Sequence, residues 1–183
     1  MTDQTQTRMT AVEFFQLPET NLPRQLLNGE VIEMTAPELD HQEVVGNIFM
    51  LFRQAVQQIG GKAYVAPVDV QFDAENVPQP DVLLLLPDSP CQAVGTRRLS
   101  GPPDLIAEVL SPSTARLDRR EKFRLYERYG VREYWIAEPR DQLVTVWQHR
   151  DGGFILLDVY GTGETFTSSL IGNVNCATIF AGL

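Results

Sequence analysis

Two stretches of this sequence decide the fold: PDVLLLL at residues 80–86 and DLIAEVL at residues 104–110. Apolar residues run through both without alternation, which predicts strands buried on both faces of a sheet. Asp81 opens the first strand, and Glu108 lies inside the second between apolar neighbours. An ionised carboxylate in such a place costs on the order of several kcal/mol unless a cation or hydrogen bonds compensate it. A divalent metal with a nearby lysine would compensate both acids.

Length and composition bound the organisation of the chain. At 183 residues and 43% hydrophobic, it is long enough for one domain with its own core. We expect a flexible polar N-terminus over residues 1–9 and a single domain over residues 10–183. No run of about 18 apolar residues and no signal-peptide pattern is found, so we expect a cytoplasmic protein without a membrane partner. Cys91 and Cys176 lack metal-ligand spacing and are expected to be reduced.

The charge is unevenly distributed. The net charge of −9 argues against a general nucleic-acid binder. Residues 97–132 nevertheless hold nine of the fifteen basic residues and five of the twenty-four acids, so this segment carries +4 and the remainder −13. Two interpretations stay open: a local surface that contacts phosphates, or a solvated helix face with pairs between residues four apart.

Turn and capping signals divide the rest of the chain. They predict a short helix from Thr10 to Leu17 with a capping box between Thr10 and Glu13, and a hairpin that turns at Asn28-Gly29. Further predicted elements are helices at 39–59 and 114–129 (the latter with Ser113 as N-cap), strands at 62–73 and 131–137, a loop at 87–103, a hairpin at 143–147 and 154–159, and a last strand before a short terminal segment. Together they predict one α/β domain with a mixed sheet.

Both long helices carry polar residues on their apolar stripe. His41 falls at the centre of the stripe of helix 39–59, in its first turn, as either a buried histidine bonded to the backbone or a site residue. Asp118 and Lys122 fall within the inward arc of helix 114–129. A simple pair between residues four apart would explain these two charges but not the carboxylates on the neighbouring strands.

Metal-dependent phosphodiester cleavage needs few groups. Carboxylates hold Mg²⁺ (or Mn²⁺), which polarises the phosphate and lowers the pKa of the attacking water. Asp81 and Glu108 supply the carboxylates, and the carbonyl of Val109 is a further candidate ligand. Lys122 supplies the positive charge that stabilises the hydroxide or the developing phosphorane.

The ordered set of these residues resembles the PD-(D/E)XK nuclease superfamily and, more narrowly, a large bacterial family of restriction endonuclease-like proteins of unknown function. The matching segments are Pro80-Asp81, EVLSPST at 108–114, Asp118, Lys122, LNGE at 27–30, His41 and GVREYWI at 130–136. The match spans residues 26–147. Taken singly, a Pro-Asp pair is a weak signal, whereas the ordered set is a strong one.

The resemblance implies a restriction endonuclease-like core, with a mixed central β-sheet flanked by helices and extra β-hairpins. It implies Asp81 and Glu108 as metal ligands, with Glu30 and His41 lining the site. One position departs from the superfamily pattern: the lysine expected two residues after the glutamate is Leu110 here. In the narrower family the lysine moves to the following helix, and Lys122 is the matching position.

The leading hypothesis is a Mg²⁺-dependent endonuclease that acts on DNA. One alternative is a catalytically silent relative used as a binding or assembly module, and another is hydrolysis of RNA or a nucleotide-like substrate. The retained Asp81, Glu108 and Lys122 favour the enzyme, because a silent relative need not keep buried charges that cost stability. Restriction-type nucleases commonly act as dimers, which, with the exposed-looking Trp147, predicts a homodimer.

Overall fold

A six-stranded mixed sheet forms the centre of the protein, whose computed structural model describes residues 8–183. Within this sheet, the strands Leu105–Val109 and Glu133–Glu138 are parallel to each other, and all other neighbouring strands are antiparallel. Both strands predicted to be buried on two faces are completely buried. The order across the sheet is β11 (Gly153–Gly161), β10 (Leu143–Arg150), β9 (Glu133–Glu138), β8 (Leu105–Val109), β5 (Val82–Leu85) and β3 (Lys62–Val65).

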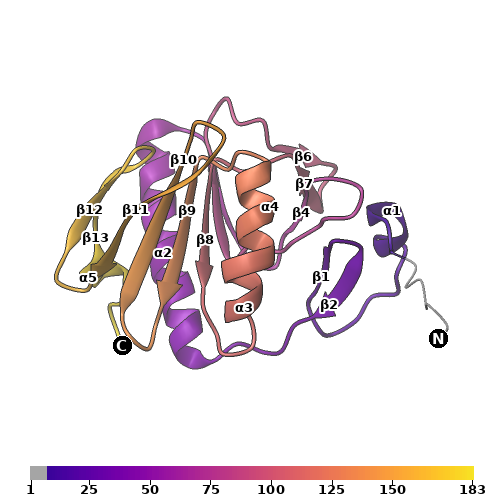
Figure 1. The fold of residues 1–183 in the computed structure, drawn as a ribbon, viewed down its shortest axis with the longest axis horizontal. Helices are drawn as coiled ribbons and strands as arrows, with labels where there is room; N and C mark the ends of the chain where they lie inside the picture. The colour runs from indigo at the N-terminus through magenta and orange to yellow at the C-terminus, as the bar shows by residue number, and fades with distance from the viewer. Residues whose placement is uncertain (1–7) are drawn as a thin grey trace.

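Helices cover both faces of this sheet (Figure 1). The long helix α2 (Leu39–Ile59) has the bounds predicted and packs on one face through residues such as Ile48 and Phe52. A helix made of α3 (Ala115–Leu117), η1 (Asp118–Lys122) and α4 (Phe123–Arg128) packs on the other. The predicted architecture, a mixed sheet flanked by helices with extra hairpins, is confirmed.

Smaller β elements surround the sheet. The predicted hairpin is β1 (Arg24–Leu27) with β2 (Glu30–Glu33), and a second is β12 (Thr165–Ser168) with β13 (Gly172–Asn175), before α5 (Cys176–Ile179). The prediction of a plain loop at residues 87–103 was wrong. That segment contains β6 (Gln92–Val94) and β7 (Arg98–Ser100), which form a three-stranded sheet with β4 (Asp69–Gln71).

The N-terminal part of the described chain is attached to the β1–β2 hairpin. The predicted capping box is present at α1 (Ala11–Phe14), where Thr10 and Glu13 bond to each other's backbone. Within the segment predicted to be flexible, residues 1–7 lie outside the described residues. Met9 N donates a hydrogen bond of 2.9 Å to Gly29 O, so the described end of that segment is held in place.

The helix predicted for residues 114–129 contains an irregular turn. η1 is a π-helical turn of five residues between α3 and α4. The predicted N-cap, Ser113, was wrong: the helix begins after Thr114, whose backbone N–H bonds to the Ser111 hydroxyl at 3.3 Å. The hydroxyl of Tyr134 on β9 donates to the carbonyl oxygen of Asp118 at 3.0 Å, which fixes the π turn against the sheet.

The outer edge of the sheet is unusually apolar. Among the described residues, β11 pairs with a single neighbour, β10, and its Ile155, Leu156, Leu157 and Val159 are 38–50% exposed. Trp147, which the sequence suggested to be exposed, is partly buried against Phe123 instead, with ring centroids 4.9 Å apart.

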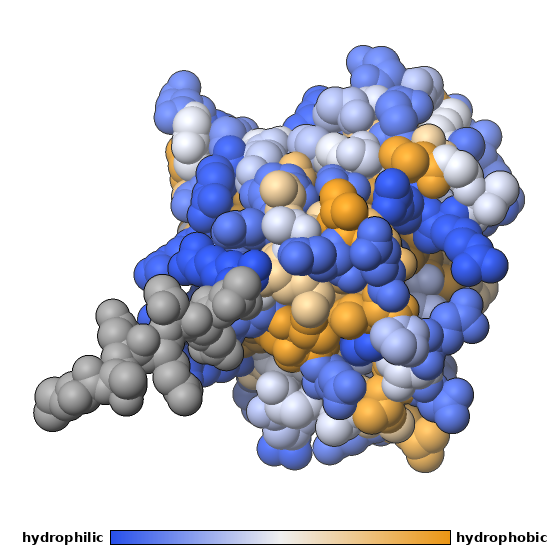
Figure 2. All heavy atoms as spheres, turned by 90° about the vertical axis from the view of Figure 1, so that its right-hand side faces the viewer, coloured by the Kyte–Doolittle hydropathy of each residue, from blue (hydrophilic) through white to orange (hydrophobic). Residues whose placement is uncertain are grey.

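No helix within residues 8–183 is long and apolar enough to span a bilayer. On the side of the molecule that carries the N-terminal elements, apolar residues form only small groups among hydrophilic ones (Figure 2).

Candidate active site

Strand alternation places Asp81 and Glu108 on the same face of the sheet. β5 and β8 are antiparallel neighbours with Val82 opposite Ala107, so the two acids lie side by side. Side chains two apart on a strand share a face. Both acids therefore point to the same face of the sheet as the apolar residues of their strands that pack under α4. Asp81 N–H donates to Glu108 Oε2 at 3.3 Å, and Val109 N–H donates to Asp81 Oδ2 at 2.8 Å.

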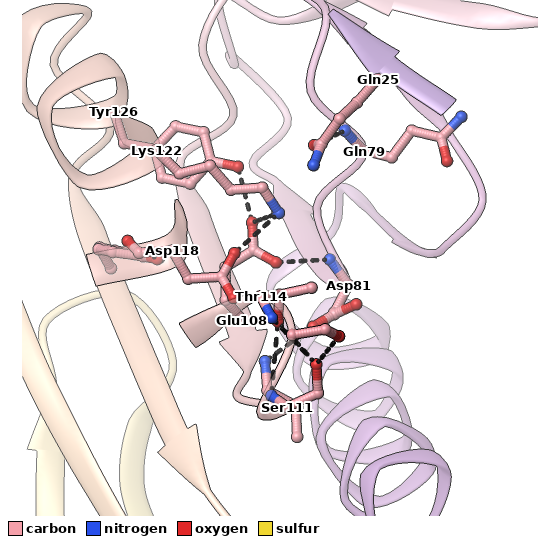
Figure 3. A network of polar contacts seen from close by, with 12 residues as sticks. Gln25, Gln79, Asp81, Glu108, Ser111, Thr114, Asp118, Lys122 and Tyr126 are labelled. Atoms are coloured by element: carbon pink, nitrogen blue, oxygen red, sulfur yellow. Dashed lines mark hydrogen bonds and ion pairs between the residues drawn. The ribbon is translucent and has the colours of Figure 1, made fainter. Parts of the chain in front are cut away.

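Glu108 is compensated by two donors from the helix above it. Lys122 Nζ lies 2.9 Å and the Tyr126 hydroxyl 2.7 Å from its Oε1 (Figure 3). Only 1% of Glu108 is exposed. Burial raises the pKa of its carboxyl, and the charge of Lys122 opposes that shift.

Lys122 lies between two carboxylates. Its Nζ is also 3.1 Å from Asp118 Oδ1, and both side chains of this pair are almost completely buried. Burial alone would lower the pKa of Lys122, but the charges of Asp118 and Glu108 raise it above its ordinary value. The lysine is therefore held in its charged form, which suits electrostatic stabilisation rather than proton abstraction.

His41 reaches Asp81 from α2. Its Nε2 lies 3.4 Å from Asp81 Oδ2, and 12% of its side chain is exposed. Burial works to lower the pKa of His41, but the hydrogen bond and the charge of Asp81 raise it overall. Its Nδ1 is buried without a hydrogen-bond partner among the residues described. The helical wheel had left two interpretations of His41 open, and the structure places it beside the site.

These groups lie along a pocket of about 410 Å³. Its walls include His41, Asp81, Glu108, Asp118 and Lys122, together with the loop at residues 34–38 that leads into α2. Three hydroxyl groups, from Ser111, Ser113 and Thr114, line the side where β8 passes into the helix, and the Ser111 hydroxyl lies 3.0 Å from each of the other two.

A family model described as "Putative restriction endonuclease" (Uma2) matches residues 11–178. The chain belongs to the Uma2 family. It is 29% identical over 136 residues to the "Uncharacterized protein sll1609" of Synechocystis sp., covering 71% of this chain and 75% of that protein. Its fold is similar to the crystal structure of "a putative nuclease belonging to DUF820" from Anabaena variabilis, with a TM-score of 0.77 at 18% identity, over 94% of this chain and 98% of that one.

Four of the residues predicted for the site of this Uma2 protein line the pocket: Asp81, Glu108, Lys122 and His41. Val109 is not among the lining residues, although its backbone N–H bonds to Asp81. Glu30, which the resemblance placed at the site, is exposed at the start of β2 and is not among the residues that line the pocket. Two of the residues that hold Lys122 and Glu108 have no role in the predicted site: Asp118 belongs to the matching segments and to the inward arc of its helix without a role of its own, and Tyr126 is not among the predicted site residues. A tyrosine four residues after an inward lysine was the available signal for the second.

The oxygen donors of this pocket fit a hard divalent cation. Asp81 is 20% exposed at its side chain, and its Oδ1 takes part in no hydrogen bond or ion pair of residues 8–183. Carboxylate and carbonyl oxygens are the ligands that Mg²⁺ prefers. The described chain contains no group of three or more His, Cys, Asp or Glu side chains arranged to hold a metal. Water and substrate oxygens would therefore have to complete the coordination around Asp81, Glu108 and the Val109 carbonyl.

Proposed function

We propose that this Uma2 protein is a Mg²⁺-dependent endonuclease that hydrolyses phosphodiester bonds in DNA. The observation that carries the proposal is the placement of Lys122 against Glu108, with Asp81 beside them, along one pocket. A buried lysine held charged between carboxylates serves a reaction in which negative charge develops nearby. The family description supports the same reaction class.

Each side chain of the pocket has a separate role in such a reaction. Bound Mg²⁺ would polarise the phosphate and lower the pKa of the attacking water. Asp81 and Glu108, with the carbonyl of Val109, are the groups that would hold it. Lys122 stabilises the extra negative charge of the pentacovalent phosphorus, and Asp118 and Tyr126 position it through the contacts described. The hydroxyls at residues 111–114 are neutral donors for the non-bridging phosphate oxygens.

One observation favours the second candidate function, a catalytically silent module that binds or assembles. Both oxygens of Glu108 already accept hydrogen bonds from protein donors: Lys122 and Tyr126 on Oε1, and the Asp81 backbone on Oε2. The carboxylate is thus compensated without a cation, so its burial alone does not require a metal.

Plasmid nicking separates the two functions. Supercoiled DNA is incubated with the protein and Mg²⁺, Mn²⁺ or EDTA, with a single-stranded RNA of matched length as a second substrate. We expect metal-dependent nicking of DNA that Asp81→Ala abolishes and Glu30→Ala leaves unchanged, because Glu30 lies outside the pocket. Equal nicking by Asp81→Ala, or no cleavage by the wild type with either metal, would contradict the proposal. Cleavage of RNA alone would reassign the substrate.

A further inference from the structure

The outer face of the helix α3–η1–α4 carries a row of arginines. Each is four residues from the next and each is exposed, although the whole chain has a net charge of −9. We call these residues the Arg row: Arg116, Arg120, Arg124 and Arg128. Four residues of helix rise about 6 Å, so the row extends over roughly 18 Å.

The acids of the same segment are directed away from the Arg row. Glu108 and Asp118 are buried around Lys122, and Asp104 is buried 3.5 Å from Arg132. Glu127 accepts a hydrogen bond from the backbone of Phe154 at 2.9 Å. One carboxylate oxygen of Glu121 is buried without a partner in the described chain.

The Arg row itself is unneutralised. None of its members forms an ion pair within 4.0 Å with any residue of 8–183, whereas Arg119, on the same helix, pairs with Glu138 at 2.9 Å. The sequence had left open a solvated helix face with pairs between residues four apart. In the structure those pairs are missing from the Arg row, and the positive charge it carries stays on the surface.

We propose that the Arg row binds the sugar–phosphate backbone of a nucleic acid. Exposed arginines repeated along one helix suit a linear array of phosphates, because each guanidinium presents a fork of donors to a phosphate. Roughly 18 Å corresponds to about five phosphates along one strand of a duplex. The inference rests on the proposed function, since the polyanion is taken to be the substrate of the pocket that Lys122 lines from the same helix.

Binding measured without a metal tests the Arg row independently of cleavage. Fluorescence anisotropy of a labelled duplex in EDTA is followed over a salt titration for the wild type and for a variant with all four arginines changed to Gln. We expect at least a tenfold loss of affinity and a salt slope shallower by about 3–4, since each phosphate contact contributes about 0.9. Exposed positions tolerate such changes, so the melting temperature should stay close to that of the wild type.

A matched control removes the same charge elsewhere. The control variant carries four substitutions to Gln at exposed basic residues outside the helix α3–η1–α4: Arg53, Lys62, Arg97 and Arg150. We expect this control to bind within a few-fold of the wild type. Equal losses in both variants would mean that only net charge matters, and would overturn the inference.

The remaining outcomes separate the surface from the enzyme. Unchanged binding by the Arg row variant, with plasmid nicking by the wild type, would overturn the Arg row and leave the nuclease proposal standing. Row-dependent binding without nicking would support the Arg row and count against the nuclease. Absence of duplex binding by the wild type overturns the inference. So does equal row-dependent binding of a polyglutamate peptide, because it would make the surface a site for acidic proteins.

Discussion

Lys122 Nζ lies 2.9 Å from Glu108 Oε1, and the side chains of both residues are at least 96% buried. The two charges compensate each other, because burying either one alone would cost a desolvation free energy on the order of several kcal/mol. Asp118, 3.1 Å from the same lysine, makes the group a triad with one cation and two acids. The lysine is therefore needed for the fold as well as for the proposed chemistry.

Replacing Lys122 with Met should destabilise the protein. It leaves Glu108 and Asp118 buried without their cation, which costs about 3–5 kcal/mol when one partner of a buried pair is removed. Urea unfolding measures the loss. The double variant Lys122→Met with Glu108→Gln should recover part of it, because one uncompensated charge is gone; a double variant less stable than the single one would contradict this coupling.

Lys122→Met should also reduce cleavage, measured under conditions in which the variant is folded. The lost stabilisation of the transition state is expected to lower the rate about 100- to 1,000-fold, the effect of removing one electrostatic donor. Lys62→Met, on the edge strand and outside the pocket, serves as its control. Wild-type cleavage by folded Lys122→Met, with Asp81→Ala inactive, would show that another cation serves the reaction.

Glu108→Gln should weaken metal binding. Calorimetry with Mn²⁺ is expected to show at least a tenfold loss of affinity, about 1.4 kcal/mol, because the amide removes the charge but keeps the shape. Glu30→Gln removes a carboxylate that is exposed and outside the pocket, and it should bind Mn²⁺ like the wild type. Equal affinities in the two variants would remove Glu108 from the ligand set.

Asp73 should contribute to stability above acid pH. Burial alone raises its pKa, but hydrogen bonds from the Tyr129 hydroxyl, the Glu75 backbone and Asn76 lower it below its ordinary value of 3.8. A lowered pKa in the folded state stabilises the fold above the unfolded pKa, and the stability is lost as pH falls through the folded value. The melting temperature of Asp73→Asn should therefore fall less steeply than that of the wild type below about pH 4. Parallel acid limbs would show that Asp73 is not coupled to folding.

The exposed edge strand β11 should mediate self-association into a homodimer. Its apolar side chains and unpaired backbone edge are suited to pairing with a second copy of the same strand. Light scattering at micromolar concentration should give a dimer mass, and Leu156→Lys should shift it to the monomer. Val12→Lys changes another exposed apolar residue, on α1, and serves as the control. A monomer mass for the wild type would contradict the prediction.

Much of the fold was predictable because its signals are local. The Asn28-Gly29 turn requires positive φ at both residues and has it, at 51° and 75°. Gly60 ends α2 where the sequence placed its end. The unbroken apolar runs around Asp81 and Glu108 predicted two buried strands, and the helical wheel predicted the inward position of Lys122. Each of these features depends on residues that lie close together in the sequence.

Other features depend on tertiary packing that the sequence pattern does not contain. The strands within residues 87–103 exist because β7 pairs with β4, about thirty positions earlier in the chain. The sequence pattern predicts that Trp147 is exposed, but in the structure Phe123 packs against it. Glu133 lies within the matching segment 130–136, but no local pattern predicts its burial. It is fully buried and accepts hydrogen bonds from Trp135, Gln148, Ser168 and Ser169, which tie the β12 hairpin to the sheet.

The π turn at residues 118–122 has a consequence for comparing relatives. A π turn holds one more residue than the corresponding α-helical turn, and each residue rotates an α-helix by about 100°. A relative that lacks this residue would keep the same sequence letters on either side but present them at a different angle to the sheet. An alignment that places no gap at this turn would match Lys122 to a residue that faces solvent. In such a relative the lysine is displaced by one position rather than lost, so its helix should be aligned from each end separately.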